Sequence, residues 1–179
     1  MKLGRFVSKS SFHLQKNVIG LLTLIDSRLY MKLYNKLLRR HGFKLNGSPR
    51  FIAKSARFDD FNRITLGERL VVSMNVHFLT HDYSYTTALI AAGKKPATDI
   101  GILRDITIGD NVFIGMNSII LPGTNIGNNV IVGAGSVVRG KIPDFSVVAG
   151  NPAIVISNIL DFEKKATDRK DNDLIIDKK

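Results

Sequence analysis

The chain contains no cysteine among its 179 residues. This absence excludes a disulfide framework, a thiolate metal site and a cysteine nucleophile, and it fits a reducing compartment. No apolar run reaches the ~18–20 residues that span a bilayer. The first residues, MKLGRFVSKSSFHL, lack the unbroken apolar core and small-residue cleavage site of a signal peptide. We therefore expect a cytoplasmic protein, either free or held at the inner surface of the membrane.

Acidic residues are scarce at the N-terminus. Residues 1–48 contain six lysines and four arginines against the single aspartate Asp26, so they carry +9 of the total net charge of +11. Because this excess lies on one terminal arm and the remaining chain is nearly neutral, we expect no nucleic-acid partner. A hydrophobic content of 44% with 23% charged residues is typical of one globular domain.

Residues 1–48 are predicted to form a basic helical arm. Helical spacing of apolar residues favours one helix over residues 16–41, ending before Gly42. Its apolar stripe would consist of Leu21, Leu22, Ile25, Leu29, Leu33 and Leu37. This helix would pack on the remaining chain or on another subunit, or it would bind a membrane surface, with Tyr30 and Tyr34 at the interface.

A six-residue repeat follows the arm. Every sixth residue is aliphatic and β-branched at Ile102, Ile108, Ile114, Ile120, Ile126, Val132 and Val138. Small or β-branched companions follow four residues later at Ile106, Val112, Ser118, Thr124, Val130, Ser136 and Ile142. This period matches neither a helix nor an alternating strand, and it indicates short strands stacked in coils. We predict a mainly β, parallel β-helix over residues 49–156.

The repeat fails at two places. It slips by two residues before Leu66, next to Asp59, Asp60 and Phe61. It halts after His81, and residues 83–101 form a loop too long for a simple connection, which is typical of a functional or a disordered excursion. Residues 157–179 are predicted to form a short helix near 158–167 and a loose tail.

The run ITIGDNVFIGMNSIILPGTNIGNNVIVGAGSVV, with the later IPDFSVVAGNPA, resembles the hexapeptide-repeat acyltransferases. The similarity covers residues 50–156 and points to sugar and polysaccharide O-acetyltransferases such as the galactoside and maltose enzymes. It implies a left-handed β-helix assembled as a homotrimer, with active sites between subunits. It also implies acetyl-CoA as acyl donor and a sugar or glycan acceptor, and the sequence suggests no metal site.

His81 is the candidate catalytic residue, because a neutral imidazole can take a proton from an attacking hydroxyl. Its setting in FLTHDYS, before a loop, resembles the family's general base. Asp59 and Asp60 resemble an acidic pair of which one member binds the acceptor, and the spacing does not show which. Asp82 is a further candidate at this site for orienting the imidazole, a task that a backbone carbonyl can also perform.

The resemblance also implies a donor site. Gly115, Gly133, Ala134, Gly135 and Ser136 match the motif positions that line the acetyl-CoA groove. A serine stabilises the oxyanion in the galactoside enzymes, and this chain has Met116 there, so only its main-chain N–H can donate. The cation that meets the cofactor's phosphates is displaced to Arg139 or Lys141.

We therefore predict an acetyl-CoA-dependent O-acetyltransferase that acts on a hydroxyl of a sugar or glycoconjugate precursor by direct transfer. Two alternatives stay open. One is N-acetylation of an amino sugar nucleotide, and the other is a catalytically inactive β-helical scaffold. The histidine and the long loop argue against the scaffold, since a scaffold needs neither.

Overall fold

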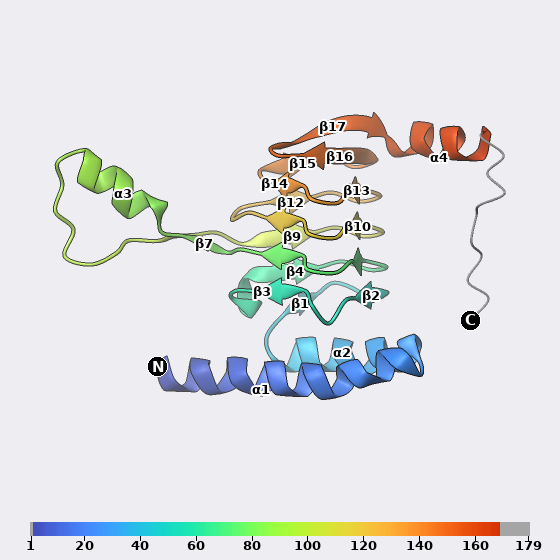
Figure 1. Ribbon diagram of the computed structural model, residues 1–179, viewed down its shortest axis with the longest axis horizontal. Helices are drawn as coiled ribbons and strands as arrows, with labels where there is room; N and C mark the ends of the chain where they lie inside the picture. The colour runs from blue at the N-terminus through green and yellow to red at the C-terminus, as the bar shows by residue number, and fades with distance from the viewer. Residues whose placement is uncertain (1, 169–179) are drawn as a thin grey trace.

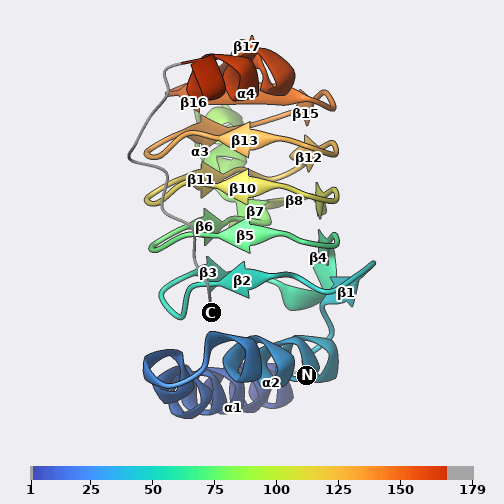
Figure 2. The ribbon, with the colours of Figure 1, turned by 90° about the vertical axis from the view of Figure 1, so that its right-hand side faces the viewer.

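The computed structural model describes residues 2–168, with side chains from residue 9 onward. A helical hairpin lies beneath a stack of short strands, a long excursion projects from one side of the stack, and a helix leaves its top (Figure 1). The second view shows the coils lying parallel to one another above the two N-terminal helices (Figure 2).

The strands form a parallel β-helix with three faces. Face A contains β1 (Lys44–Leu45), β4 (Ile64–Leu66), β9 (Ile106–Ile108), β12 (Asn125–Ile126) and β15 (Lys141–Ile142). Face B contains β2 (Phe51–Ile52), β5 (Val71–Val72), β10 (Phe113–Ile114), β13 (Ile131–Val132), β16 (Ser146–Gly150) and β17 (Ala153–Asn158). Face C contains β3 (Arg57–Phe58), β6 (His77–Phe78), β11 (Ile119–Ile120) and β14 (Val137–Val138).

The repeat predicts the core correctly. Ile114 pairs with Val132 eighteen residues later, so three six-residue units make one coil. The repeating aliphatics from Ile108 to Val138 are almost completely buried along the axis. Their companions fill the corners: Ser118 and Thr124 are buried and donate their hydroxyl hydrogens to backbone carbonyls. The predicted β-helix is confirmed, and each coil buries the apolar residues of its neighbours.

Two members of the sequence pattern differ from the prediction. Ile102 belongs to β8 (Ile102–Leu103), which pairs antiparallel with β7 (His81–Asp82) at the base of the excursion, so it is not part of the stack. Ile142 pairs with Ile126 and therefore occupies the main aliphatic position of β15, two residues early. The last corner before it is shortened, and the regular pattern ends there.

Side chains also join successive coils along the edge between faces A and B. Asp110 accepts a hydrogen bond from the backbone N–H of Glu68 at 2.7 Å, and Asn128 accepts one from Asp110 at 2.8 Å. Asp144 accepts one from Asn128 at 2.9 Å. This ladder satisfies corner N–H groups that no strand partner reaches, and it fixes the coils against one another.

The single helix predicted over residues 16–41 is wrong. The arm is a hairpin of α1 (Lys2–Gly20) and α2 (Ser27–Arg40), joined by a short 3₁₀ turn, η1 (Leu21–Leu24). The carboxylate of Asp26 caps α2 by accepting hydrogen bonds from the N–H groups of Arg28 and Leu29 at 2.7 and 3.1 Å. An N-cap begins a new helix, which is why the chain reverses here.

The predicted apolar stripe of the arm is right only in part, because Leu37 is buried in the core and Leu22 packs against it. Leu21, Ile25 and Leu29 are exposed, whereas Tyr30 and Tyr34 are fully buried against the β-helix and so are not at a membrane interface. The hydroxyl of Tyr30 donates to the carbonyl of Ile52 at 2.7 Å, and Lys16 donates to the carbonyl of Ala56 at 2.8 Å. The hairpin thus closes the bottom of the stack.

An aromatic cluster continues this contact into the core. Phe12 of α1 lies 4.6 Å from Phe61, measured between ring centroids, and Phe61 stacks on Phe43 at 4.9 Å. Phe43 meets Phe58 at 5.0 Å, and Phe58 stacks on Phe78 at 4.8 Å. Phe61 belongs to η2 (Phe61–Arg63), which occupies the predicted two-residue slip.

The excursion is partly helical rather than a plain loop, because it contains α3 (Ser84–Ala91). It leaves the stack through β7 and returns through β8, and it extends well beyond the prism (Figure 1).

At the C-terminal end of the stack, β17 pairs antiparallel with β16, so the parallel stack ends there. The predicted C-terminal helix is present as α4 (Ile159–Asp168), and the predicted tail lies outside the described residues.

Candidate active site

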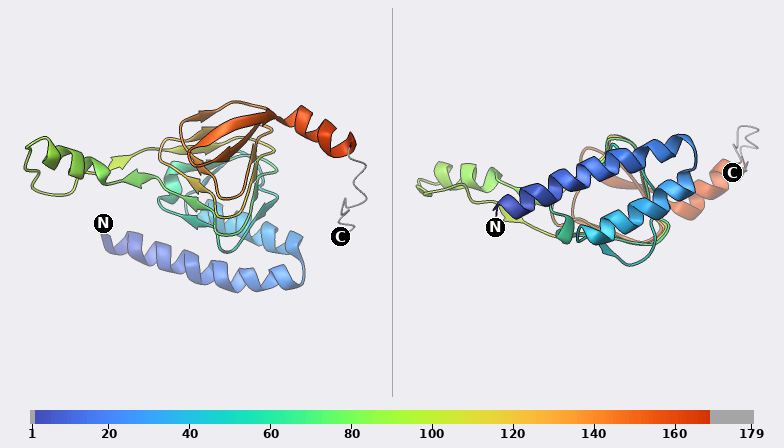
Figure 3. Two further views of the ribbon diagram at one scale, coloured as in Figure 1. Left: turned by 45° about the horizontal axis from the view of Figure 1, so that its top comes forward. Right: turned by 90° about the horizontal axis from the view of Figure 1, so that it is seen from below.

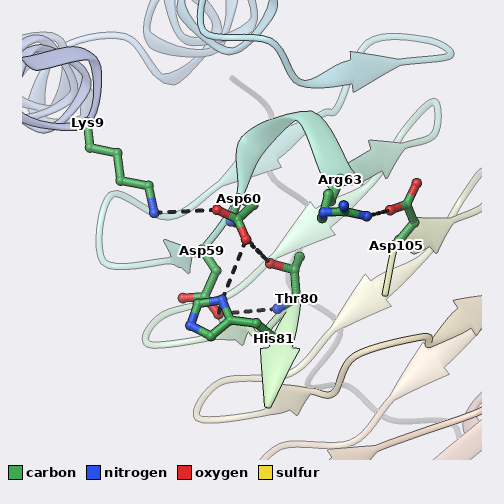
Figure 4. A network of polar contacts seen from close by, with 7 residues as sticks. All are labelled: Lys9, Asp59, Asp60, Arg63, Thr80, His81 and Asp105. Atoms are coloured by element: carbon green, nitrogen blue, oxygen red, sulfur yellow. Dashed lines mark hydrogen bonds and ion pairs between the residues drawn. The ribbon is translucent and has the colours of Figure 1, made fainter. Parts of the chain in front are cut away.

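His81 faces the two adjacent aspartates of the slip. Its Nδ1 atom lies 3.5 Å from Oδ2 of Asp59 and 3.5 Å from Oδ2 of Asp60 (Figure 4). The three side chains are only partly exposed, at 34%, 27% and 17% respectively. Because carboxylates accept hydrogen bonds, these contacts favour the tautomer with its proton on Nδ1, in which Nε2 has the lone pair.

Thr80 holds both carboxylates in place. Its backbone N–H donates to Oδ2 of Asp59 at 3.2 Å, and its hydroxyl donates to Oδ2 of Asp60 at 3.0 Å. The same hydroxyl oxygen accepts from the backbone N–H of Asp60 at 3.3 Å. Thr80 is completely buried, so the histidine and its partners rest on the rigid end of a coil.

Register explains why these residues meet. Arg57 pairs with His77 and Phe58 with Phe78, which places the residues after β3 beside those after β6. The coil between them is lengthened by two residues at η2, and both aspartates lie between the end of β3 and the start of η2. The slip in the sequence therefore marks the site, although it does not by itself show that Asp59 and Asp60 face His81.

Basic residues surround this group. Lys9 of α1 places Nζ 3.9 Å from Oδ1 of Asp60, and Arg63 forms a 2.7 Å ion pair with Asp105 (Figure 4). Burial lowers the pKa of His13, on the same helix as Lys9, and the charges of Lys16, Lys9 and Arg57 lower it further. The N-terminal hairpin therefore contributes charge to the surroundings of His81.

Asp82 does not orient the imidazole. Its carboxylate turns away and accepts a hydrogen bond from the backbone N–H of Ser84 at 2.8 Å, at the start of α3. That bond lowers the pKa of the Asp82 carboxyl. The orienting role predicted for Asp82 is therefore wrong, because the aspartates of the slip already occupy the Nδ1 side.

Tyr83 was not identified from the sequence. Its ring packs edge-on against His81 with 5.5 Å between centroids, and it also lies over Gly101. A side-chain carbon at Gly101 would meet the Tyr83 ring at 2.9 Å. The only sequence signal for this contact was the position of an aromatic residue directly after the HD pair.

The predicted donor-site residues gather on another edge. Gly115 and Met116 follow β10, and the segment Gly133–Ser136 follows β13, so they stack one above the other where face B meets face C. The carbonyl of Met116 accepts from the N–H of Gly135 at 2.8 Å. A Cβ on Gly115 would approach the backbone N of Ala134 to 2.5 Å, so this position has no room for a side chain.

The side chain of Ser136 is hydrogen-bonded within its own corner. It is completely buried, its hydroxyl donates to the carbonyl of Gly133 at 2.6 Å, and its oxygen accepts from Gly150 at 3.2 Å. Its side chain therefore supports the corner and does not face a ligand. Ala134 and Gly135, by contrast, are exposed at the surface of the same corner.

Arg139 and Lys141 lie away from the glycine edge. Arg139 follows β14, at the edge between faces C and A, which is also the edge that carries His81. Lys141 lies on face A and lines a surface pocket with Thr107, Asn125 and Asp144. Both cations are exposed, and the structure does not bring them to Gly115 or Gly133 within one chain.

The described residues include no group of three or more His, Asp or Glu side chains able to hold a metal ion. Across residues 2–168, no helix combines the length and the apolar character needed to cross a bilayer. The described residues thus place an imidazole beside two carboxylates at one edge of the prism and a glycine-rich segment at another.

Residues 105–140 match the family model described as bacterial transferase hexapeptide (six repeats). Protein CapG of Staphylococcus aureus is 37% identical over 151 residues, which cover 80% of this chain and 85% of CapG. The galactoside O-acetyltransferase of Escherichia coli K12 is 36% identical over 106 residues, covering 59% of this chain and 49% of that enzyme.

Solved structures show the same fold. A galactoside acetyltransferase in complex with coenzyme A superposes with a TM-score of 0.59 at 22% identity, covering 87% of this chain and 84% of that one. A maltose O-acetyltransferase from Clostridium difficile 630 gives 0.56 at 26% identity, covering 84% of this chain and 87% of that one. The extent and identity of the CapG match, together with the repeat model, show that the chain belongs to the hexapeptide-repeat acyltransferase family.

Proposed function

We propose that this chain is an acetyl-CoA-dependent O-acetyltransferase that acetylates a hydroxyl of a sugar or glycoconjugate precursor. The observation that carries the proposal is the contact of His81 Nδ1 with the carboxylates of Asp59 and Asp60. Relatives named galactoside O-acetyltransferase and lipopolysaccharide biosynthesis O-acetyl transferase support the acceptor class. The structures with bound acetyl coenzyme A and coenzyme A support the donor.

In this mechanism His81 is the general base. Its Nδ1–H is held by the aspartates, and Nε2 takes the proton of the acceptor hydroxyl while that oxygen bonds to the thioester carbonyl carbon. The tetrahedral intermediate then expels the CoA sulfur as the C–S bond breaks. The imidazolium returns its proton to that sulfur, so the products are the acetyl ester and free CoA, with the enzyme unchanged.

The paired carboxylates stabilise the protonated form of His81 in this mechanism. When Nε2 takes the proton, the imidazolium gains a positive charge that lies 3.5 Å from each Oδ2. Oriented negative groups stabilise this charge without reorganisation, as they do for other catalytic histidines. We thus assign Asp59 and Asp60 to positioning His81, with their remaining oxygens available to acceptor hydroxyls.

The two halves of the site are proposed to come from two subunits. In one chain His81 lies at the edge between faces C and A, whereas Gly115, Met116, Gly133 and Ala134 lie at the edge between faces B and C. A cyclic homotrimer places unlike edges of neighbours together. The glycine edge of one subunit would hold acetyl-CoA, and the Met116 main-chain N–H would face the oxyanion.

The cation for the CoA phosphates stays a proposal with two candidates. Arg139 shares an edge with His81 and would reach the donor from the same subunit as the base. Lys141 lies on face A, and would reach the donor only if that face also borders the cleft between subunits. Loss of CoA affinity in Arg139→Met but not in Lys141→Met, measured by calorimetry, would distinguish them.

Transfer of labelled acetyl groups from acetyl-CoA to a panel of sugars and glycans tests the proposal. We expect a labelled ester, sensitive to mild base, on at least one acceptor. His81→Ala should lower kcat by about 10²–10⁴-fold, while His77→Ala, another partly exposed histidine on the same coil, should retain kcat. A base-stable amide product would show N-acetylation. Absence of both CoA binding and transfer would show a scaffold and overturn the proposal.

A further inference from the structure

The underside of the helical hairpin is an uncovered surface. It faces away from the β-helix, with α1 and α2 side by side, and no other part of the described chain lies beneath it (Figure 3). We define the hairpin underside as the exposed apolar residues Leu14, Val18, Leu21, Leu24, Ile25 and Leu29 together with the exposed basic residues Lys32, Lys36, Arg39 and Arg40.

The apolar half of this surface lies on α1 and the connecting turn. Phe12, Lys16 and Gly20 are buried toward the β-helix. Leu14, Val18 and Leu21 recur at the same helical spacing on the opposite side of α1. Leu24 and Ile25, at the turn, are 86% and 84% exposed. Side chains this exposed and this close together mark an interaction surface.

The basic half lies on α2. Tyr30, Tyr34 and Leu37 face the β-helix, so Leu29, Lys32 and Lys36 share the outward side of the helix. Arg40 extends this line toward the end of α2, and the exposed Arg39 beside it donates from its guanidinium to the carbonyl of Gly47 at 3.0 Å. Among residues 26–40 the only acidic side chain is Asp26, which caps α2. The underside thus pairs an apolar ridge with a parallel basic ridge.

We propose that the hairpin underside binds the surface of an anionic lipid bilayer. The apolar ridge would enter the boundary between headgroups and acyl chains, and the basic ridge would contact the negative headgroups. A second copy of this chain is a poorer occupant, because pairing two undersides would bring the basic ridges near one another. No described helix crosses the bilayer, so the contact is peripheral.

Docking in this way sets the β-helix upright on the membrane. The hairpin lies flat across the bottom of the stack, so the coils rise above it in order, with β7, the strand that contains His81, in the lower half (Figures 1 and 2). In the proposed trimer all three undersides would face the same plane, and binding would be multivalent. The inference itself needs neither the trimer nor the acetyl-transfer reaction.

Vesicle flotation with the purified full chain tests this proposal. Vesicles of phosphatidylcholine alone are compared with vesicles that also contain phosphatidylglycerol. We expect flotation with the anionic vesicles and loss of it as salt is raised toward about 1 M, where charges are screened within ~3 Å. Equal binding to both vesicle types, or to neither, would overturn the proposal.

Two double variants separate the ridges. Leu24→Glu/Ile25→Glu and Lys32→Glu/Lys36→Glu should each lower the partition coefficient on anionic vesicles by about tenfold or more. The matched control is Ile90→Glu/Ile100→Glu, which places the same charges on two exposed apolar residues of the excursion. The control should float like the unaltered protein.

Circular dichroism and light scattering complete the test. The ridge variants are expected to keep the helix content and the molar mass of the unaltered protein while losing flotation. If a ridge variant instead changes the molar mass, the surface is an interface between copies and the lipid proposal is wrong. Acetyl transfer to a soluble acceptor is measured in parallel, so that failure of the catalytic proposal is seen separately.

Discussion

Lys9 of α1 lies with Nζ 3.9 Å from Oδ1 of Asp60, whose other oxygen faces the imidazole of His81. The N-terminal hairpin therefore reaches the proposed catalytic residues and is more than a support for the bottom coil. The same ammonium lies 5.9 Å from the centroid of the Phe61 ring, so its position is held from two sides.

Lys9→Met removes this charge and keeps most of the side-chain volume. Partly exposed ion pairs contribute about 0–1 kcal/mol, so we expect kcat to fall by no more than about fivefold, with Lys9→Arg restoring it. Steady-state kinetics checks this against Lys164→Met, an exposed lysine on α4. A loss of hundredfold would mean that Lys9 contacts the reacting groups directly.

Asp59 and Asp60 should partly substitute for one another. Since His81 Nδ1 is equally distant from both carboxylates, Asp59→Asn and Asp60→Asn should each leave one acceptor for its proton. We expect each single change to lower kcat by about tenfold or less, and the double change to approach the ~10²–10⁴-fold loss of the base itself. A single variant as inactive as His81→Ala would identify one aspartate as the sole partner.

We expect the free energy of unfolding to depend on pH because Lys16 is buried. Burial, aided by the charge of Arg57, lowers its pKa from 10.5 to about 8. The unfolded chain therefore holds this proton more tightly than the folded protein, and the free energy of unfolding should rise as pH increases from 8 toward 10, by about 2 kcal/mol. Above pH 10 the trend should reverse, because burial raises the pKa of Tyr30 and Tyr34.

Urea unfolding at a series of pH values measures this effect. Lys16→Met keeps the apolar stem and cannot titrate, so the rise between pH 8 and 10 should be absent in that variant. The same rise in both proteins would assign it to other groups.

Gly109 tests the close spacing of the coils. A Cβ there would lie 2.6 Å from the carbonyl oxygen of Gly127, so Gly109→Ala must push two coils apart, and we expect a loss of about 3 kcal/mol. Gly140 has a positive φ of 74° but open space around its Cβ position, so Gly140→Ala should lose only about 1 kcal/mol. Thermal unfolding compares the two, and equal losses would show that crowding at the edge is unimportant.

The architecture of the stack could be predicted because the same six-residue pattern of apolar residues recurs in each coil. A β-branched aliphatic at every sixth position, such as Ile114 or Val132, specifies an axis-facing residue without reference to distant parts of the chain. The hairpin could not be predicted this way, because leucines such as Leu21 and Leu29 fit a helical stripe whether or not they are buried. Asp26, an N-cap residue before a new helical run, was the available signal for its turn.

The site was predictable in part for a related reason. His81 stood out because the repeat stops directly after it. The contact of Asp59 and Asp60 with His81 depends on the register between β3 and β6. That register can be assigned only when the lower coil is known to be longer by two residues. Asp82 does not have its predicted role, because its carboxylate accepts a hydrogen bond from the backbone N–H of Ser84.

The excursion leaves and re-enters the stack at a single place, where His81 and Leu103 lie opposite each other in a two-stranded antiparallel ladder. The coil before the excursion and the coil after it therefore keep the same strand pairing, whatever the number of residues between Asp82 and Ile102. Insertions, deletions and exchanges in that segment leave the core untouched while changing what stands beside the imidazole. The segment between β7 and β8 can thus be exchanged as a unit without changing how the β-helix folds.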